Sequence, residues 1–318
     1  MALRICVTGA AGQVGKVISR AAANKGHTVF GVDLPPGPGP DSADSQRGSY
    51  SYQQLDVCDI GGLRRYVEDN KCDAMVHMAA VLNNPNRTIK GKEWTESDIH
   101  TINTTMSYNI LRVSADLGIK RVVQASSVNA IGMLQPVAVS HGTVLKRSPV
   151  GSDPPTFDYF PLDEKHPFRP QAAYDLSKQI CEVQADAFAR KYPDMRIASM
   201  RYHWVVEPSL LSADALHRRG GEPKDLWGYI SEADTAAATL LGLTAPEQTF
   251  PAGHEAFFIV APTQHQQSST SALIDQWYPQ STRRKQWRGN EGLYDCSKAE
   301  KLLGWTAKVS FPWTVPSP

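Results

Sequence analysis

The chain has 318 residues, of which 41% are hydrophobic and 20% are charged, a balance typical of a folded globular protein rather than a disordered one. Its 33 basic and 32 acidic side chains leave a formal net charge of +1, which excludes the strongly basic footprint of a nucleic-acid-binding protein. No run approaches the roughly 18 apolar residues that cross a bilayer, so no membrane partner is expected.

The first residues indicate a strand and not a secretory signal, because no basic stretch precedes a long apolar segment. The five cysteines are scattered and form no C-x-x-C pair. We therefore interpret them as reduced thiols and expect a cytoplasmic protein. The nine histidines show no paired ligand spacing, so no metal site is expected.

Apolar runs alternate with helical stretches along the chain. Strands are predicted at Leu3–Thr8, Thr28–Asp33, Ala74–Met78, Arg121–Ala125, Ile197–Arg201 and Ala256–Val260. Helices are predicted at Val14–Lys25, Gly61–Asn70, Ile99–Leu117, Tyr174–Lys191 and Ser231–Leu243. This order predicts an α/β fold with a doubly wound parallel sheet. We expect a dinucleotide-binding domain at 1–201 and a smaller substrate-binding lobe at 202–318, with the helix near 231–243 packing back on the first domain.

Two segments interrupt the alternation. Pro35–Ser51 is rich in Pro, Gly and Ser and is expected to be a surface loop. Met133–Pro170 is a longer irregular stretch, and segments of this length in compact domains are often functional. Because it precedes a candidate catalytic helix, we expect it to form part of the pocket rim.

Three glycines follow the first strand in Gly9-Ala-Ala-Gly12-Gln-Val-Gly15 and open the first helix. Glycines permit a tight turn and let the backbone approach a pyrophosphate, while the helix start offers N–H donors. A glycine triplet alone is also compatible with a plain turn. Its position between strand and helix favours dinucleotide binding by Gly9, Gly12, Gln13, Val14 and Gly15.

Two carboxylates are placed at strand ends: Asp33 ends Thr28–Asp33, and Asp56 is taken as the end of a further strand that precedes Ala74–Met78. Asp33 can accept hydrogen bonds from both adenosine ribose hydroxyls and would repel a 2′-phosphate, so NAD is favoured over NADP. The alternative for Asp33 is a helix cap or a turn. Asp56 and Val57 are placed at the adenine edge, although Asp59 is also a plausible helix N-cap.

A phenol and an ammonium lie four residues apart in Tyr174-Asp-Leu-Ser-Lys178, on one helix face. A phenol with a pKa of about 10 is a poor base at neutral pH. Lys178 and a positive nicotinamide would stabilise its phenolate, so that Tyr174 could exchange a proton with a substrate. The same spacing recurs at Tyr294-Asp-Cys-Ser-Lys298, which we assign to a terminal helix ending at Gly304.

Polar side chains accompany Tyr174. Ser126 and Ser127 come at a strand end, where open α/β sheets place their sites. A serine hydroxyl there could hold the substrate oxygen, and the alternative is a turn or cap. Asn103 could hold a water that relays protons to Lys178, and the alternative is a surface or cap residue.

Together these pieces resemble the extended short-chain dehydrogenase/reductase family, including its NAD-dependent epimerase/dehydratase relatives. The matching segments occur in family order and are Thr8–Gly15, Asp33, Asp56-Val57, His77–Ala80, Asn103, Ala125–Ser127, Tyr174-x-x-x-Lys178 and Ser297–Trp305. The resemblance implies a Rossmann-like sheet, a nicotinamide cofactor, a Ser-Tyr-Lys site with Ser127 as its serine, and commonly a homodimer formed through two helices. Met78, Ala79 and Ala80 would line the cofactor, although a buried strand end explains this segment as well.

Departures from the family pattern bear on the substrate. Trp204 stands where nucleotide-sugar members carry Asn, and Trp227 stands where they carry a diphosphate-binding arginine. Each lost charge-assisted hydrogen bond is worth about 1.5–3 kcal/mol, which disfavours sugar-nucleotide epimerases. Val128-Asn129 follows Ser127 where dehydratases carry an acid, which disfavours dehydration.

What remains is redox chemistry on a smaller or more apolar substrate. Trp204 and Trp227 are candidates for the pocket wall, or else core residues, and Asn83, Asn129 and His203 are possible polar contacts. The sequence therefore predicts an NAD-dependent oxidoreductase acting on a secondary alcohol, ketone, sugar or uronate. Its rivals are an epimerase that re-reduces the same carbon and a dinucleotide-binding sensor without turnover.

Overall fold

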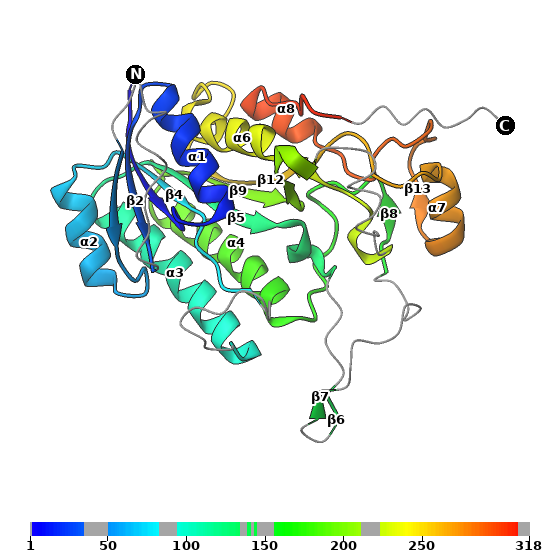
Figure 1. Ribbon diagram of the computed structural model, residues 1–318, viewed down its shortest axis with the longest axis horizontal. Coiled ribbons are helices and arrows are strands. Elements are labelled where there is room, and N and C mark those ends of the chain that lie inside the picture. The colour runs from blue at the N-terminus through cyan, green and yellow to red at the C-terminus, as the bar shows by residue number, and fades with distance from the viewer. Residues whose placement is uncertain are drawn as a thin grey trace.

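The computed structural model describes residues 2–34, 50–82, 94–133, 156–210 and 223–310, together with the backbone of 139–140 and 143–144. Its centre is a seven-stranded sheet with the order β12-β9-β5-β4-β1-β2-β3, in which all neighbours run parallel (Figure 1). The strands are β1 (Arg4–Thr8), β2 (Thr28–Asp33), β3 (Tyr50–Gln54), β4 (Ala74–His77), β5 (Arg121–Ser127), β9 (Arg196–Tyr202) and β12 (Gly253–Ile259). The predicted Rossmann-like, doubly wound α/β fold is confirmed.

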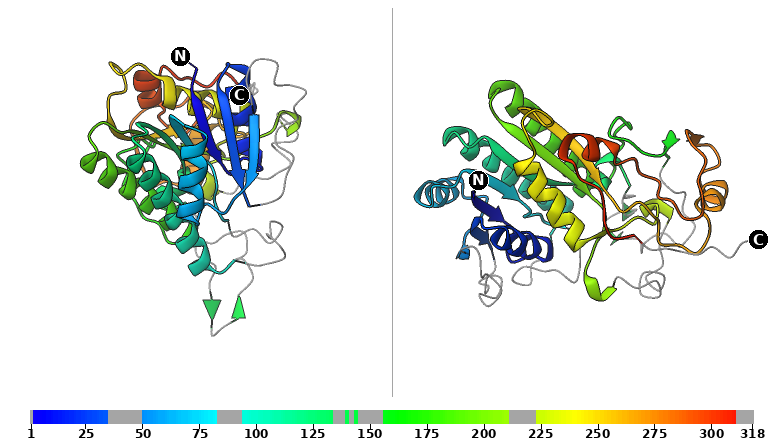
Figure 2. Two further views of the ribbon diagram at one scale, coloured as in Figure 1. Left: turned by 90° about the vertical axis from the view of Figure 1, so that its left-hand side faces the viewer. Right: turned by 90° about the horizontal axis from the view of Figure 1, so that it is seen from above.

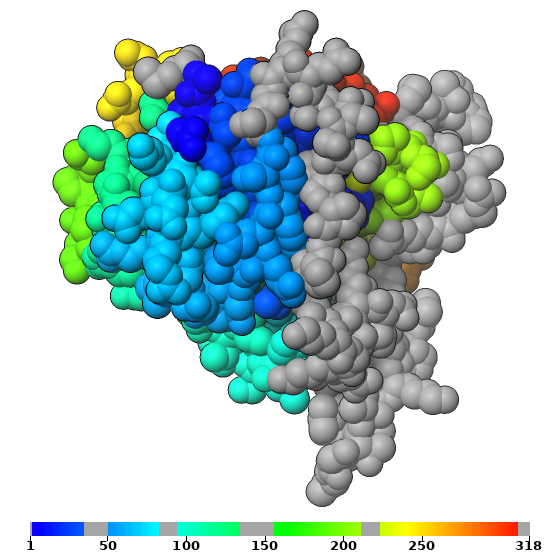
Figure 3. Space-filling view, turned by 60° about the vertical axis from the view of Figure 1, so that its left-hand side comes forward, coloured from blue at the N-terminus to red at the C-terminus, as the bar shows by residue number. Residues whose placement is uncertain are grey.

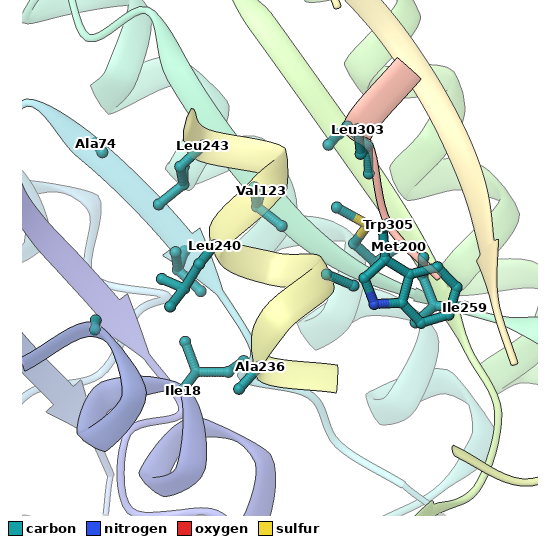
Figure 4. Packing of buried hydrophobic residues seen from close by; sticks show 14 of the residues in the cluster. Ile18, Ala74, Val123, Met200, Ala236, Leu240, Leu243, Ile259, Leu303 and Trp305 are labelled. Atoms are coloured by element: carbon teal, nitrogen blue, oxygen red, sulfur yellow. The ribbon is translucent and has the colours of Figure 1, made fainter. Parts of the chain in front are cut away.

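Helices cover both faces of the sheet (Figures 1 and 2). One face carries α1 (Gln13–Asn24), α6 (Glu232–Thr244) and α8 (Ser297–Leu303), and the other carries α2 (Ile60–Asp69), α3 (Glu96–Asp116) and α4 (Ala173–Lys191). Alternation along β1 separates the two layers, since Ile5 and Val7 face the first while Cys6 faces the second. Figure 4 shows the first layer, where α6 lies over the sheet and beside Ile18 of α1.

Local signals set the helix ends. The Asp59 carboxylate accepts a hydrogen bond from Gly62 N at 3.0 Å, so this residue is the N-cap of α2. A capping box between Thr95 and Asp98 starts α3 at Glu96, earlier than the predicted Ile99. Gly304 ends α8 in the left-handed conformation, with φ of 69°.

The second part of the chain also contributes to the central sheet. β12 pairs with β9 over seven residues, from Gly253↔Arg196 to Ile259↔Tyr202, although it comes from the segment expected to form a separate lobe. The short elements outside the sheet are η1 (Val128–Ile131), β8 (Tyr159–Phe160) with β13 (Thr282–Arg283), β10 (Val205–Val206) with β11 (Ile230–Ser231), η2 (Pro208–Leu210), η3 (Pro223–Asp225) and α7 (Thr270–Trp277). A domain boundary at 201/202 stays a prediction.

Only part of the expected pocket rim, Met133–Pro170, lies within the described residues. Its described residues Met133, Phe157, Phe160 and Leu162 belong to a buried cluster under the short β8–β13 pair. Within the segment, β6 (Val139–Ser140) pairs antiparallel with β7 (Thr143–Val144). Of the predicted loop Pro35–Ser51, residues 35–49 lie outside the described residues, whereas Tyr50 and Ser51 belong to β3 and not to a loop. Figure 3 shows the end of the molecule where β3 and α2 reach the surface.

None of the described helices is long and apolar enough to span a membrane.

Candidate active site

A cavity of about 700 Å³ opens at the carboxyl ends of the strands, next to the point between β1 and β4 where the strand order reverses. The predicted site residues that line it are Gly9, Gly12, Gln13, Val14, Gly15, Asp33, Asp56, Val57, Met78, Ala79, Ala80, Ser127, Asn129, Tyr174, Lys178, His203 and Trp204. Asn103 and Trp227 do not line it, and Asn83 lies outside the described residues. No described residue of 133–170 lines it either, so the rim prediction fails for that part.

The glycine turn fits closely against the next strand. Gly9 has φ of +70°, and a Cβ there would lie 2.6 Å from Ala79 N. A Cβ on Gly15 would lie 2.1 Å from Gly9 O. Gly12 N donates to Gly9 O at 3.0 Å, and no side chain caps the start of α1. The first N–H groups of α1 therefore face a cavity with room for a pyrophosphate.

Asp33 ties the end of β2 to this turn. Its Oδ2 accepts a hydrogen bond from Ala11 N at 3.0 Å, and its Oδ1 accepts one from Leu34 N at 2.8 Å. Asp33 therefore does stabilise a turn, as the alternative interpretation held. Its carboxylate can still accept hydrogen bonds from a ribose, because each oxygen has a second lone pair. At the same end of the cavity, Asp56 Oδ1 accepts from Cys58 N at 2.8 Å.

The residues after β4 form the opposite wall. Met78 N donates to Thr8 O at 3.1 Å, which brings Ala79 against the glycine turn. His77 itself is buried, with its Nδ1 2.7 Å from Thr8 Oγ1. Burial and the charge of Lys178 lower the pKa of His77 to about 3. His77 is therefore a neutral residue inside the sheet, beside the cofactor wall.

Ser127, Tyr174 and Lys178 meet where β5 ends against α4. Lys178 Nζ donates to Ala125 O at 2.7 Å and lies 5.5 Å from the centre of the Tyr174 ring. The side chains of Ser127 and Tyr174 share a hydrogen bond, and Ser127 Oγ accepts another from Asn129 N at 3.1 Å. The three groups that the resemblance assigns to catalysis thus stand together in one cavity.

The electrostatics of Tyr174 differ from the expectation. Removal from water raises the pKa of the phenol well above its usual value, and Asp175 adds to this, while the hydrogen bond with Ser127 lowers it. Burial lowers the pKa of Lys178. In the chain itself desolvation therefore outweighs the expected effect of Lys178, and Tyr174 carries its proton at neutral pH.

Asn103 has a different set of partners from the predicted one. Its Nδ2 donates to Val81 O at 3.0 Å and to Ser177 Oγ at 3.1 Å, and its Oδ1 accepts from Val81 N at 2.7 Å. Both N–H donors of the amide are taken by protein atoms, so they do not hold a relay water. Asn103 instead fastens the segment after β4 to α4.

The structure places His203 and Trp227, two predicted substrate residues, differently from each other. His203 Nδ1 accepts from Trp204 N at 2.6 Å, so Nε2 is the protonated nitrogen and donates to Asp225 O at 2.8 Å. Burial lowers the pKa of His203 to about 4, and both nitrogens of this neutral ring are bonded to backbone atoms, although the residue lines the cavity. Trp227 does not form the pocket wall, because it is 2% exposed and packs edge-on against Tyr278.

Several lining residues escaped sequence reasoning, among them Leu82, Trp94, Asp225 and His265. Asp225 and His265 reach the cavity through a contact between segments that are distant in the sequence. His265 N donates to Trp227 O at 3.0 Å, which brings a distant loop beside the turn at Asp225. No local pattern in the sequence marks such a contact.

Comparison with known proteins decides the family. The chain belongs to the NAD dependent epimerase/dehydratase family, whose model matches residues 5–219. The prediction of the family is confirmed, and with it the expectation of an enzyme with oxidoreductase or epimerase chemistry.

Individual relatives are more distant. L-arabinose 1-dehydrogenase (NAD(P)(+)) of Haloferax volcanii is 28% identical over 230 residues, which cover 71% of this chain and 75% of the relative. The structure of UDP-glucose 4-epimerase from Thermotoga maritima with UDP-glucose has a TM-score of 0.65 at 20% identity, covering 98% of this chain and 96% of the other. The enzyme WbmG of Bordetella bronchiseptica, in complex with NAD and UDP, has a TM-score of 0.62 at 21% identity, covering 99% and 92%.

Proposed function

We propose that this chain is an NAD-dependent oxidoreductase that transfers hydride between nicotinamide and the carbon of a secondary alcohol, ketone, sugar or uronate. One observation carries the proposal: a single cavity is lined both by the glycine turn with Asp33 and by Ser127, Tyr174 and Lys178. The dehydrogenase relative that uses NAD(P)(+) and the neighbour solved with NAD support the cofactor.

The residues present fit a dinucleotide. The N–H groups at the start of α1 would hold the pyrophosphate, Asp33 would accept hydrogen bonds from the adenosine ribose, and Asp56 with Val57 would meet the adenine. Met78, Ala79 and Ala80 would line the other side. NAD bound here would supply the hydride acceptor or donor.

The proton is handled by the chain's own side chains. Ser127 would hold the substrate oxygen, and Tyr174 would give it a proton on reduction or take one on oxidation. Lys178, held by Ala125 O, would place its positive charge beside the phenol and, together with the positive nicotinamide, act against the burial that disfavours phenolate. Asn103 would act by positioning α4, not by touching substrate.

The decisive experiment is Tyr174→Phe, assayed with a panel of alcohols, sugars and uronates by NADH absorbance. The variant should bind NAD as the wild type does and lose about 10²- to 10⁴-fold in kcat, because only the proton donor is removed. Undiminished turnover would defeat the assignment of Tyr174. Binding of NAD by a wild-type chain that turns over nothing would favour the sensor.

An epimerase is the second candidate, since the family includes epimerases. An epimerase that re-reduces the same carbon releases no NADH. Net NADH production matched to product formed would therefore separate the dehydrogenase from the epimerase.

We also propose a homodimer formed through α3 and α4. Leu176 and Val183 lie seven residues apart on one face of α4 and are 39% and 50% exposed, and Tyr108 of α3 is 45% exposed. Apolar side chains in this arrangement are typical of a helix face that packs against another helix. A cytoplasmic location stays a prediction.

A further inference from the structure

A buried ion pair lies behind the reactive end of the cavity. Glu182 of α4 is 4% exposed and Arg201 of β9 is 2% exposed. Arg201 Nε donates to Oε1 at 2.9 Å and Nη2 donates to Oε2 at 2.8 Å, so the two groups meet as a fork. The guanidinium also lies about 5 Å from the rings of Phe168 and Phe258, which hold it in place.

A cavity residue completes this pair. Ser126 Oγ donates to Glu182 Oε1 at 2.5 Å. Ser126 lines the cavity, directly precedes Ser127 and stands opposite Arg201 in the register of β5 and β9. The Glu182 carboxylate is therefore contacted by the ends of two strands at once.

The helix that carries Glu182 also carries the reactive pair. Tyr174, Lys178 and Glu182 follow each other at four-residue spacing, so they share one face of α4. Beyond Arg201, β9 continues into Tyr202, and then His203 and Trp204 line the substrate end. One carboxylate thus joins three elements that surround the reacting atoms.

We infer that Glu182 is a positioning residue for the proposed reaction: through Ser126 and Arg201 it holds the ends of β5 and β9 against α4 and so sets Ser127 relative to Tyr174 and Lys178. The inference rests on the proposed function. Fold stability alone explains the arrangement less well, because burying two charges costs desolvation that an apolar pair of the same volume would avoid.

The charge of Glu182 also affects the pKa of Lys178, which gives a second way to test the inference. The charged or titratable groups described around Lys178 are Tyr174, Cys181 and Glu182 of α4 and His77 of β4. Burial lowers the pKa of Lys178, and Glu182 is among the groups that raise it. Removing that carboxylate would also take away the forked partner of the positive Arg201 and leave Glu164 as its described acidic neighbour. Both changes would lower the pKa of Lys178 further.

The first test compares two buried serines. Ser126→Ala removes the hydroxyl that contacts Glu182 and leaves the ion pair intact. Ser199→Ala is the matched control, because Ser199 is a buried strand serine that bonds to Gln124 and His254 and does not line the cavity. We expect Ser126→Ala to lower kcat about tenfold, or about 1.4 kcal/mol, with the KM for NAD unchanged, and Ser199→Ala to leave kcat unchanged. Equal kcat in wild type and Ser126→Ala would overturn the inference.

The second test uses Glu182→Gln, with thermal melting and NAD binding to confirm that the variant is folded. The alkaline limb of its kcat profile should move to lower pH. The double variant with Ser126→Ala should lose less than the sum of the two single losses, because Ser126 and Glu182 share one contact. An unshifted limb, or additive losses, would overturn the inference. Should Glu182→Gln not fold, Ser126→Ala decides alone.

The two proposals fail in different ways. Loss of turnover in Tyr174→Phe with full activity in Ser126→Ala and Glu182→Gln would leave the oxidoreductase standing and remove the role of Glu182. A wild-type chain that oxidises and reduces nothing with NAD would remove both.

Discussion

Asp33 offers the sharpest test of how the cavity chooses its dinucleotide. Both carboxylate oxygens already accept main-chain hydrogen bonds, from Ala11 N and Leu34 N, so the position of the side chain is fixed before a ribose arrives. Asp33→Asn keeps the shape and removes the charge, and its NH₂ group would face one of these donors. A hydrogen bond to a charged acceptor is worth about 1.5–3 kcal/mol, so NAD should bind about 10- to 100-fold more weakly.

NADP should respond in the opposite sense, because a 2′-phosphate beside the neutral amide of Asp33→Asn no longer meets a like charge. The preference for NAD over NADP should therefore fall by more than the loss of NAD affinity alone. Titration followed by tryptophan fluorescence suits the measurement, since Trp94 and Trp204 line the cavity. Asp56→Asn is the control, as it removes a carboxylate from the same cavity. An unchanged preference in Asp33→Asn, or an equal change in the control, would refute the reasoning.

Three further outcomes are expected. Gly15→Ala should weaken NAD binding at least about tenfold, because its Cβ would meet Gly9 O at 2.1 Å. Gly61→Ala in α2 should not weaken binding, because a Cβ there has no neighbour closer than 3.5 Å. Equal binding of NAD by both variants in a titration would contradict the turn geometry. Burial lowers the pKa of His77 from 6.5 in the unfolded chain to about 3 in the folded one. The free energy of unfolding should therefore fall by about 1.4 kcal/mol for each pH unit below 6.5. In urea unfolding, His77→Asn should show a smaller dependence on pH, and equal slopes would refute this. Val183→Lys should shift the chain toward monomer in sedimentation experiments, and an unchanged mass would place any dimer elsewhere.

Much of the site follows from local sequence. The glycine turn, Asp33 and Ser127 sit at strand ends, and parallel strands bring their carboxyl ends to one edge. Tyr174 and Lys178 share a helix face by spacing alone. These features need only the correct order of strands and helices, which the alternation of apolar runs already indicates.

The remainder depends on contacts that spacing does not encode. Leu226 and Trp227 both adopt positive φ, at 48° and 51°, and this turn directs an indole into the core instead of the cavity. The partners of His203 are backbone atoms, one of them 22 residues away. Asn103 is likewise committed to Val81 and Ser177. A side chain's type indicates what it can bind, whereas the fold decides what it does bind.

The pairing of β12 with β9 has a consequence for how the chain is divided. All seven residues of β9 are buried, and one of its two ladders is supplied by residues 253–259. A fragment cut at residue 201 would leave the backbone N–H and C=O groups along that edge of β9 unpaired, where strands from other molecules could pair with them. During synthesis the same edge stays unprotected until the residues of β12 have left the ribosome, so completion of the nucleotide-binding half awaits the part of the chain that follows it.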